Sequence, residues 1–156
     1  MRAFRLLPLA GLLLIAGSGA PMLAGCDSGG EVCTSTDTFT TEDITPEGTD
    51  LGASIAIGQC VQVAYIGRFA DGSGTFDEGS LSFVYSTQAG LIPGFVLGMA
   101  GQRVRQTRRV QVPPDLGYGS VDIDRDNDGT PEIPACSTLE FDITVTAVFQ
   151  DNRQCQ

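Results

Sequence analysis

The sequence predicts an α+β fold in which a short helix covers one face of an antiparallel sheet. Residues 61–69, 109–112 and 139–149 each alternate between apolar and polar side chains, which is typical of strands with one buried face. Such alternation is found in antiparallel sheets that leave the opposite face in water, whereas buried parallel strands are apolar throughout. The apolar face of the sheet has to pack against another element, and residues 93–103 are the one candidate segment for this.

The N-terminal segment has the features of a bacterial lipoprotein signal. Two arginines precede an apolar run over residues 6–16, and the tetrapeptide LAGC at 23–26 is similar to a lipobox. The run is too short to span a bilayer, which takes about 20 apolar residues. An ordinary secretory signal with a chance cysteine is the alternative. We expect residues 1–25 to be removed as a signal peptide and Cys26 to carry a lipid, so that the chain is exported and anchored to a bacterial membrane, facing the periplasm or the cell surface.

The charge balance excludes several classes of protein. The chain has 9 cationic and 19 acidic side chains and no histidine. Without the two arginines of the signal, seven arginines remain against 19 carboxylates, a net charge of −12. A chain this acidic is a poor partner for nucleic acid or an anionic lipid surface, so membrane contact is expected through the lipid anchor only. The lack of histidine excludes Ser-His and Cys-His nucleophilic catalysis.

The rest of the sequence is organised as one domain between two short ends. Residues 26–37 are small, polar and rich in turn formers, which indicates a flexible tether. Residues 38–149 form the domain, and residues 150–156 form a C-terminal tail. Within the domain, residues 38–44 can form a first short strand, and residues 46–58 a loop that leads to the main sheet. About 130 residues suffice for one domain with its own core, which we expect to be a monomer.

Three further strands can be justified from their side chains. In residues 61–69 the odd positions are mostly apolar, and a DGSG turn follows. In residues 109–112 two valines alternate with polar residues until a Pro-Pro pair ends the strand. The clearest pattern is in residues 139–149, where all six odd positions are apolar and are therefore predicted to share the buried face.

The covering segment, residues 93–103, is ambiguous by composition. Pro93 suits the first turn of a helix, but Gly94, Gly98 and Gly101 lower the helix propensity. Propensity alone therefore does not decide the assignment. A cluster of arginines follows, and we expect it to form a solvated helix end and strand face: Arg103, Arg105, Arg108 and Arg109.

Four cysteines lie outside the lipobox: Cys33, Cys60, Cys136 and Cys155. An even number in an exported protein suggests two disulfide bonds, for which three pairings are open. None of the spacings is CxxC, which argues against a zinc site or a redox-active site.

Five motifs follow one another along the domain: VQVAYIG at 61–67, DGSGTFD at 71–77, LIPGF at 91–95, VPPDLGYG at 112–119 and IPACSTLEFDITVTAV at 133–148. In this order and at nearly this spacing they resemble the FKBP-type peptidyl-prolyl isomerase domain. The resemblance implies a curved antiparallel sheet of about five strands wrapped over one short helix. It also implies cis-trans isomerase activity on X-Pro bonds, with proline-containing segments of exported proteins as partners and no cofactor required.

The resemblance further implies a substrate pocket. Its catalytic positions match seven residues: Tyr65, Phe76, Asp77, Ile92, Phe95, Tyr118 and Phe141. Three more positions would complete the pocket: Leu81, Leu91 and Ile133. The floor position is most often Trp in the best-known members and is Phe95 here, and the segment after Asp77 is shorter than theirs. Taken one at a time several of these residues could be core, and their combination favours a pocket.

The role of each position follows from the family pattern. Phe95 would lie under the proline ring, and three other aromatic side chains would form the walls. The Ile92 N–H and the Tyr118 hydroxyl would donate hydrogen bonds to substrate carbonyl groups, with Asp77 at the rim beside Tyr65. Such a site needs neither a nucleophile nor a metal, because an apolar pocket favours the twisted amide over the planar one.

The same resemblance implies a disulfide pairing. In the family fold the first long strand runs antiparallel to the last. Cys60 opens the first of these strands and Cys155 lies just past the end of the other. The implied pairs are therefore Cys60–Cys155 and Cys33–Cys136.

Residues 120–132 form an acidic loop with the sequence SVDIDRDNDGTPE. Three carboxylates and the glycine after them match positions 1, 3, 5 and 6 of a calcium-binding loop: Asp124, Asp126 and Asp128. The twelfth position is Ala135, where a bidentate Glu is expected, so Asp122 or Glu132 would have to replace it. The alternative is a solvated acidic turn.

The sequence therefore favours a lipid-anchored prolyl isomerase that acts on exported chains. The main rival hypothesis comes from another class of protein, an inactive FKBP-like module that binds a peptide or a partner in the same pocket, with or without calcium. A third hypothesis is a calcium-stabilised surface domain whose pocket is vestigial. Measuring proline isomerisation separates the isomerase from both alternatives.

Overall fold

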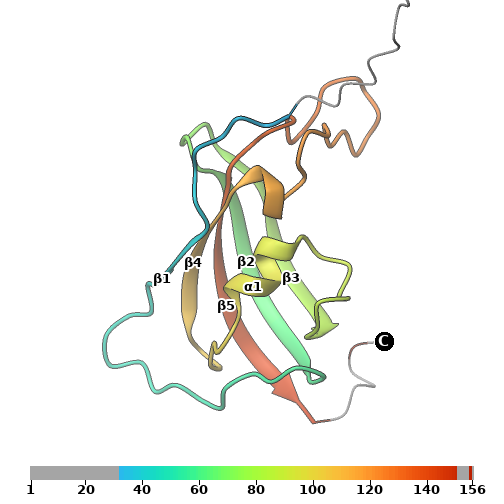
Figure 1. Ribbon diagram of the computed structural model, residues 1–156. Helices are drawn as coiled ribbons and strands as arrows, with labels where there is room; N and C mark the ends of the chain where they lie inside the picture. Colours follow the sequence, from blue (N-terminus) through green and yellow to red (C-terminus); the bar gives the residue numbers. More distant parts are fainter. Residues whose placement is uncertain (1–31, 151–154, 156) are drawn as a thin grey trace, which may run out of the picture.

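The computed structural model describes residues 32–150 and residue 155. A five-stranded antiparallel sheet curves around one short helix, which confirms the fold predicted from the sequence (Figure 1). The expected signal peptide over residues 1–25, Cys26 and the first part of the tether lie outside the described residues. None of the helices in the described part has both the length and the apolar character that crossing a membrane requires.

The strands lie in the order β1-β4-β5-β2-β3, and all neighbours are antiparallel. Their bounds are β1 Thr40–Asp43, β2 Cys60–Phe69, β3 Thr75–Val84, β4 Thr107–Val112 and β5 Leu139–Phe149. The last strand of the chain is thus the central strand of the sheet, and β1 and β3 form its edges.

The core lies between the inner face of the sheet and helix α1, Pro93–Gly98. The inward aliphatic side chains of β2, β4 and β5 have no exposed surface: Val61, Val63, Val110, Val112, Leu139, Ile143 and Val145. Met99, directly after the helix, is equally buried. The period-two pattern of the sequence follows from this burial, because alternate residues of a strand point to opposite faces.

Helix α1 is shorter than the predicted segment and ends at Gly98. Its glycines have a packing reason, since the helix backbone lies directly against β4. A Cβ atom on Gly94 would lie 2.4 Å from Val112 Cγ1, and one on Gly98 would lie 2.5 Å from Val110 Cγ2. The glycines lower helix propensity by about 1 kcal/mol each, but only residues without a Cβ allow so close an approach.

Strand β3, which the sequence analysis did not locate, pairs with β2 through a β-bulge. Gly67 pairs with Asp77 and Arg68 with Thr75, so Phe76 is an extra residue in β3. A bulge turns the extra side chain and ends the simple alternation of faces. Phe76 is therefore out of step with Leu81 and Phe83, and the positions between them on that face are Asp77 and Gly79, so β3 shows little period-two signal.

A second bulge corrects the pattern predicted for the last strand. Val145 pairs with Val63 but Ala147 pairs with Gln62, which leaves Thr146 as the extra residue of β5. After the bulge Val148 packs against the core. The prediction that Ala147 and Phe149 share the buried face was therefore wrong, because the shift exchanges the two faces.

Two disulfide bonds join segments that are distant in the sequence. They link Cys33 with Cys136 and Cys60 with Cys155, the same pairs that the family resemblance implied. The first bond attaches the N-terminal segment to the loop before β5, and the second attaches the C-terminal end to the start of β2.

Candidate functional site

A small cavity of about 140 Å³ opens between helix α1 and the inner face of the sheet. Its lining residues are Tyr65, Phe76, Asp77, Leu81, Gly90, Leu91, Ile92, Phe95, Tyr118 and Phe141. Nine of these are residues that the sequence analysis assigned to a pocket. The tenth, Gly90, was missed because glycine carries no side-chain signal.

Ile133 is the predicted pocket residue that the structure places elsewhere. Its side chain is 1% exposed and belongs to the core cluster, and it does not line the cavity. Its backbone instead pairs with that of Ile123, so that the two residues close the acidic loop at its base. The role of Ile133 is therefore to hold this loop.

Four aromatic rings form one edge-to-face cluster around the cavity. The Phe95 ring centroid lies 5.9 Å from that of Tyr65 and 5.3 Å from that of Phe141. Phe76 lies 5.7 Å from Phe141 in the same T-shaped arrangement. Phe95 is 3% exposed and sits at the bottom of this group, which fits a floor. Such pairs are each worth about 0.5–1.5 kcal/mol beyond area burial, so the rings hold one another in place.

Gly67 leaves the space that Phe76 occupies. A Cβ atom on Gly67 would lie 2.7 Å from Phe76 Cζ and 3.0 Å from Phe141 Cε1. The bulge in β3 turns Phe76 toward the cavity, and the missing side chain opposite it allows the ring to enter. The wall therefore depends on two local features of the β2–β3 pair.

The polar rim consists of Tyr65 and Asp77. The Tyr65 hydroxyl donates a 3.0 Å hydrogen bond to Asp77 Oδ2. Burial raises the pKa of Tyr65, and the hydrogen bond to Asp77 raises it further. The phenol therefore stays protonated at neutral pH and keeps the Asp77 carboxylate fixed at the cavity mouth.

Two hydrogen-bond donors are available at the cavity. The Ile92 amide N–H, at the start of helix α1, has no acceptor in the described part of the chain, as expected for the first turn of a helix. The Tyr118 hydroxyl likewise makes no hydrogen bond with another described residue. Both groups can donate to the carbonyl oxygens of a bound peptide.

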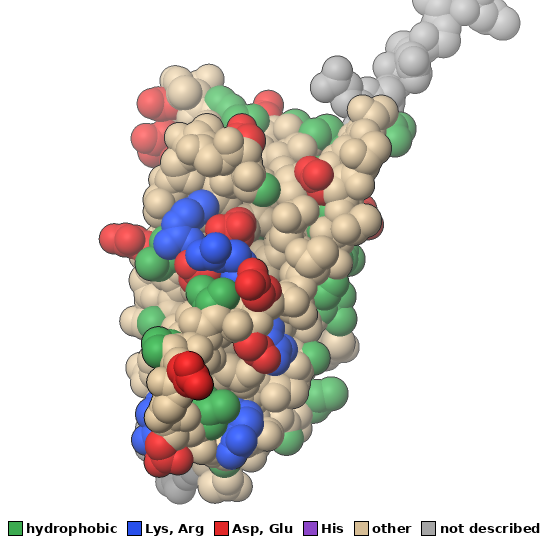
Figure 2. All heavy atoms as spheres, turned by 90° about the vertical axis from the view of Figure 1, so that its left-hand side faces the viewer, with side chains coloured by type: hydrophobic (Ala, Val, Ile, Leu, Met, Phe, Trp, Pro, Cys, Tyr) green, Lys and Arg blue, Asp and Glu red, His purple; other side chains and the backbone are tan. Residues whose placement is uncertain are grey.

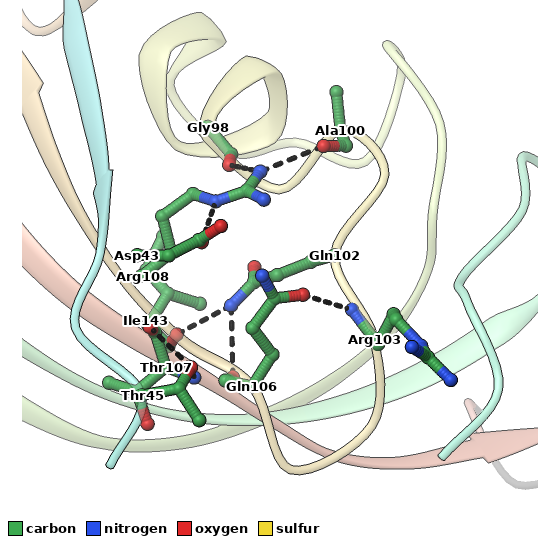
Figure 3. Close-up of polar contacts among 10 residues, drawn as sticks. All are labelled: Asp43, Thr45, Gly98, Ala100, Gln102, Arg103, Gln106, Thr107, Arg108 and Ile143. Carbon is green, nitrogen blue, oxygen red and sulfur yellow. Dashed lines mark hydrogen bonds and ion pairs between the residues drawn. The ribbon is translucent and has the colours of Figure 1, made fainter. Parts of the chain in front are cut away.

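Arg108 fixes the end of the helix that carries the floor residue (Figure 3). Its guanidinium donates to the carbonyl oxygens of Gly98, at 3.0 Å, and Ala100, at 2.8 Å, and to Asp43 Oδ1 of β1, at 2.8 Å. The Arg108 side chain is only 14% exposed, so the prediction of a solvated arginine was wrong at this position. A cation at a helix C-terminus satisfies carbonyl groups that have no partner within the helix.

Gln102 supports the turn between α1 and β4 from inside the core. Its Nε2 donates to Ile143 O, at 2.7 Å, and to Gln106 O, at 3.1 Å, while the Gln106 side chain accepts from the Arg103 amide at 2.7 Å (Figure 3). Gln102 has no exposed surface, and its Oε1 has no partner among the described residues. These side-chain hydrogen bonds add to the backbone hydrogen bonds that join the turn to β5 and to the loop before β2.

Arg109 belongs to an ion-pair network on the outer face of the sheet. It donates to Asp142 Oδ1 at 2.8 Å, and Arg68 contacts Asp142 Oδ2 at 2.7 Å. Both arginines also approach Glu140, and the Asp142 side chain is 13% exposed. Arginine and acidic side chains are interspersed over the adjoining face (Figure 2). This mixture matches no anion site, because every arginine of the network already has a carboxylate.

The acidic loop is ordered by its own side chains. Carboxylates of Asp124, Asp126 and Asp128 accept hydrogen bonds from backbone N–H groups of the same loop, at 2.7–3.2 Å. One oxygen from each lies within 4.8 Å of the others. Asp124 Oδ1 is buried and has no hydrogen-bond partner among the described residues.

A larger groove of about 760 Å³ lies beside the N-terminal segment. It is bordered by Asp37, Asp71 and Glu132 and by several hydroxyl side chains, and it shares no lining residue with the aromatic cavity. The aromatic cavity is smaller but is the one that gathers apolar walls and free donors. A ligand with an apolar ring and two carbonyl groups fits it better.

An aromatic cavity between a short helix and a curved five-stranded sheet is typical of one class of protein, the FKBP-type prolyl isomerases. A family model described as "FKBP-type peptidyl-prolyl cis-trans isomerase" matches residues 52–146. The chain therefore belongs to this family, whose isomerisation chemistry needs no cofactor.

Individual relatives agree with this assignment. FK506-binding protein 3 of Candida albicans is 37% identical over 100 residues, which are 62% of this chain and 22% of that protein. The chain thus spans about a fifth of that relative's length. Among solved structures, a peptidyl-prolyl cis-trans isomerase from Pseudomonas syringae pv. tomato is similar, with a TM-score of 0.56 and 26% identity over 81% of this chain and 87% of that one. AtFKBP13 shares the fold, with a TM-score of 0.58 and 24% identity over 75% of this chain and 98% of that one.

Proposed function

We propose that the chain is an active peptidyl-prolyl cis-trans isomerase that acts on X-Pro bonds of exported, incompletely folded proteins. The observation that carries this proposal is the cavity itself, which combines four packed aromatic rings with two unused donors, the Ile92 N–H and the Tyr118 hydroxyl. A proline ring would lie on Phe95, and the donors would hold the flanking carbonyl groups.

The proposed mechanism is desolvation of a twisted amide. The barrier to rotation, about 18–20 kcal/mol, comes from the partial double bond of the peptide. Twisting removes the resonance and with it much of the charge separation between carbonyl oxygen and nitrogen. An apolar cavity therefore binds the twisted amide more favourably than the planar one, which lowers the barrier.

The experiment is a proline isomerisation assay by NMR exchange, with the Cys26→Ser form of the chain and several X-Pro peptides. We expect the chain with an unmodified pocket to accelerate isomerisation. The rate should fall in Tyr118→Phe and should fall further in Phe141→Ala, because the latter substitution removes a wall of the cavity. Leu97→Ala is the control, since Leu97 is on the same helix as Phe95 but is 48% exposed and outside the cavity. Equal rates for all variants would contradict the proposal.

The second candidate function is a binding module that uses the same cavity without catalysis. The small volume of about 140 Å³ favours it, because a tight cavity can hold a ring without room for the amide to rotate. A chain that binds proline-containing peptides in an NMR titration but does not accelerate isomerisation would replace the first proposal with this one.

The proposed location is a bacterial membrane surface, with the chain exported and held by a lipid on Cys26. The LAGC tetrapeptide at 23–26 and the two disulfide bonds support it, because disulfides persist in oxidising compartments. In a bacterial host the chain should be labelled by a radioactive fatty acid and should sediment with membranes, whereas Cys26→Ser should do neither. Equal labelling of both forms would refute lipidation.

Weak calcium binding by Asp124, Asp126 and Asp128 is a further part of the proposal. The convergence of their oxygens and the unpartnered Asp124 Oδ1 fit a hard cation, whereas Ala135 supplies no twelfth ligand. We expect affinity of about millimolar strength, as in extracellular modules. A melting temperature that does not rise at about 10 mM calcium, or that rises equally in Asp126→Ala, would leave a solvated turn.

A further inference from the structure

We propose that Arg125 is a specificity-determining residue that favours substrates with a carboxylate side chain next to the proline, an inference that rests on the proposed isomerase function. Arg125 extends from the acidic loop to the rim of the aromatic cavity. Its Nη2 lies 3.5 Å from Asp77 Oδ2, the same oxygen that accepts the Tyr65 hydroxyl. It thereby places a cation beside a cavity whose lining residues include none.

The Arg125 side chain is not needed to hold its own loop. Paired backbone hydrogen bonds of 2.9 and 3.2 Å between Ile123 and Ile133 close the base of the loop. Within the loop, side-chain carboxylates accept hydrogen bonds from backbone N–H groups. Arg125 takes part through its backbone N–H, which donates to Glu132 Oε2 at 2.7 Å, and not through its side chain. The guanidinium can therefore act on a ligand without the loop losing its conformation.

The hydrogen-bonding capacity of Arg125 is the least used among the described arginines. Each of the other five, at positions 68, 103, 105, 108 and 109, has at least one oxygen acceptor within 3.2 Å of its guanidinium. Arg125 has one contact, at 3.5 Å, and its side chain is 42% exposed. A guanidinium has five N–H donors in a planar fork that matches a carboxylate, so most of its donors remain available.

The Asp77 carboxylate, 3.5 Å from Arg125 Nη2, and the carboxylates of the loop oppose this preference. They do not cancel a direct contact, because the long Asp77 contact uses one nitrogen of the guanidinium and leaves its other N–H donors available. Repulsion from carboxylates further away is screened over about 8 Å at physiological ionic strength. A direct contact between the Arg125 fork and a peptide carboxylate lies well within this length. Since exposed ion pairs are weak, the expected preference is about two- to fivefold.

The test compares blocked peptides that differ only in one residue beside the proline. Glu, Gln, Lys or Leu is placed before the proline in one series and after it in another, and kcat/KM is measured by NMR exchange with the Cys26→Ser chain. We expect a Glu/Gln ratio of about two to five in one series, carried by KM, and a smaller ratio at about 0.5 M salt. Arg125→Gln should abolish the preference, and Arg125→Lys should retain part of it, because lysine keeps the charge but not the fork.

Arg105→Gln is the matched control. Arg105 also forms an exposed Arg–Asp pair, with Asp50 at 3.2 Å, but it is not at the cavity, so the Glu/Gln ratio should not change. A ratio that is the same in wild type and Arg125→Gln, or a preference for Lys over Gln in both series, overturns the proposal. The Leu peptide tests isomerase activity separately. If isomerisation of the Leu peptide is not accelerated, the proposed isomerase function fails. The role of Arg125 is then tested separately, by comparing the affinities of the Glu and Gln peptides in an NMR titration.

Discussion

At the scale of single residues, Gly67 determines whether the aromatic wall of the cavity can form. The space opposite Phe76 exists because Gly67 has no side chain, and a Cβ there would lie 2.7 Å from the Phe76 ring. The sequence of β2 alone predicts neither the position of the Phe76 ring nor the bulge in β3 that turns it. A glycine within a strand thus marks the place where a side chain from the neighbouring strand enters.

Gly67→Ala should lower peptide affinity and destabilise the fold by about 1–3 kcal/mol, because the Phe76 ring must move out of the cavity. NMR titration with a proline-containing peptide and urea unfolding measure the two effects. Gly79→Ala, in the adjacent strand, is the control: a Cβ there would have its nearest contact at 3.8 Å, to Tyr65. Unchanged affinity in Gly67→Ala would show that the wall does not depend on this space.

Asp142 should make stability depend on pH. The hydrogen bond from Arg109 holds the pKa of Asp142 below its usual value, and Arg68 adds to the effect. Because the folded pKa is the lower one, the stabilisation is complete above the unfolded value of about 4 and is lost as pH falls through the folded value. Asp142→Asn should therefore cost about 1–3 kcal/mol at pH 7.

Urea unfolding at neutral and acid pH tests this sign. The difference between wild type and Asp142→Asn should shrink as the pH falls below about 4. Asp50→Asn serves as control, since the Asp50 side chain is 95% exposed and its pair with Arg105 should contribute little at any pH. A difference that stays constant down to acid pH would rule out the linkage.

The helix is the element whose sequence and structure conflict most. By propensity its glycines argue against a helix, yet they allow α1 to lie on β4 and bring Phe95 to the cavity floor. The backbone approach outweighs the propensity because a Cβ at either position would overlap a valine methyl group. Tertiary packing here overrides the local preference.

Gly98→Ala should consequently destabilise the protein by about 1–3 kcal/mol, although alanine is the better helix former. The second substitution Val110→Ala removes the methyl groups that the new Cβ would meet at 2.5 Å. In a double-mutant cycle the two substitutions should therefore be less harmful together than the sum of their separate costs. Strict additivity of the two unfolding free energies would contradict the close approach.

Apart from the exposed edge strand β1, which falls within the predicted residues 38–44, the sequence predicted the strands whose inner face is buried without interruption. Strands β2, β4 and the first half of β5 were found because alternate side chains enter one core. β3 was missed because it is an edge strand with a bulge, so its apolar residues follow no single period. Thr146 could not be identified as a bulge either, since apolar residues continue on both parities after it.

The candidate site was predictable only as far as the family motifs extend. They contain eight of the ten cavity residues; Leu81, between two motifs, was placed by the resemblance, and the tenth is a glycine. Ile133 was misplaced because an apolar side chain at a motif position fits core and pocket equally well. Arg125 was not found, because its contact with Asp77 joins residues 48 positions apart, from a loop without periodicity.

At the scale of the whole molecule, the two disulfide bonds close loops of about the domain's own length. The paired cysteines are 103 and 95 residues apart in the sequence. Closing loops this long restricts the unfolded chain and should contribute about 3–5 kcal/mol each. The small core then does not have to stabilise the fold alone.

Replacing both members of the Cys60–Cys155 bond by serine should lower the free energy of unfolding by about 3–5 kcal/mol. Cys33→Ser with Cys136→Ser gives the comparison for the second bond. Urea unfolding under oxidising and reducing conditions measures both, and reduction should make wild type similar to the variant that lacks all four cysteines. A wild type whose unfolding free energy does not change on reduction would contradict this account.

The place of β5 in the sheet has a consequence for the timing of biosynthesis. Residues 139–149 leave the ribosome after every other strand, yet they form the centre of the sheet between β4 and β2 (Figure 1). Until then the nascent chain can form only two separate strand pairs, β1–β4 and β2–β3, whose unpaired edges are open to wrong pairing. Phe95 precedes this step and Phe141 arrives with it, so the cavity forms only when the last strand is inserted. A partly synthesised chain therefore lacks the cavity to which we assign the proposed activity.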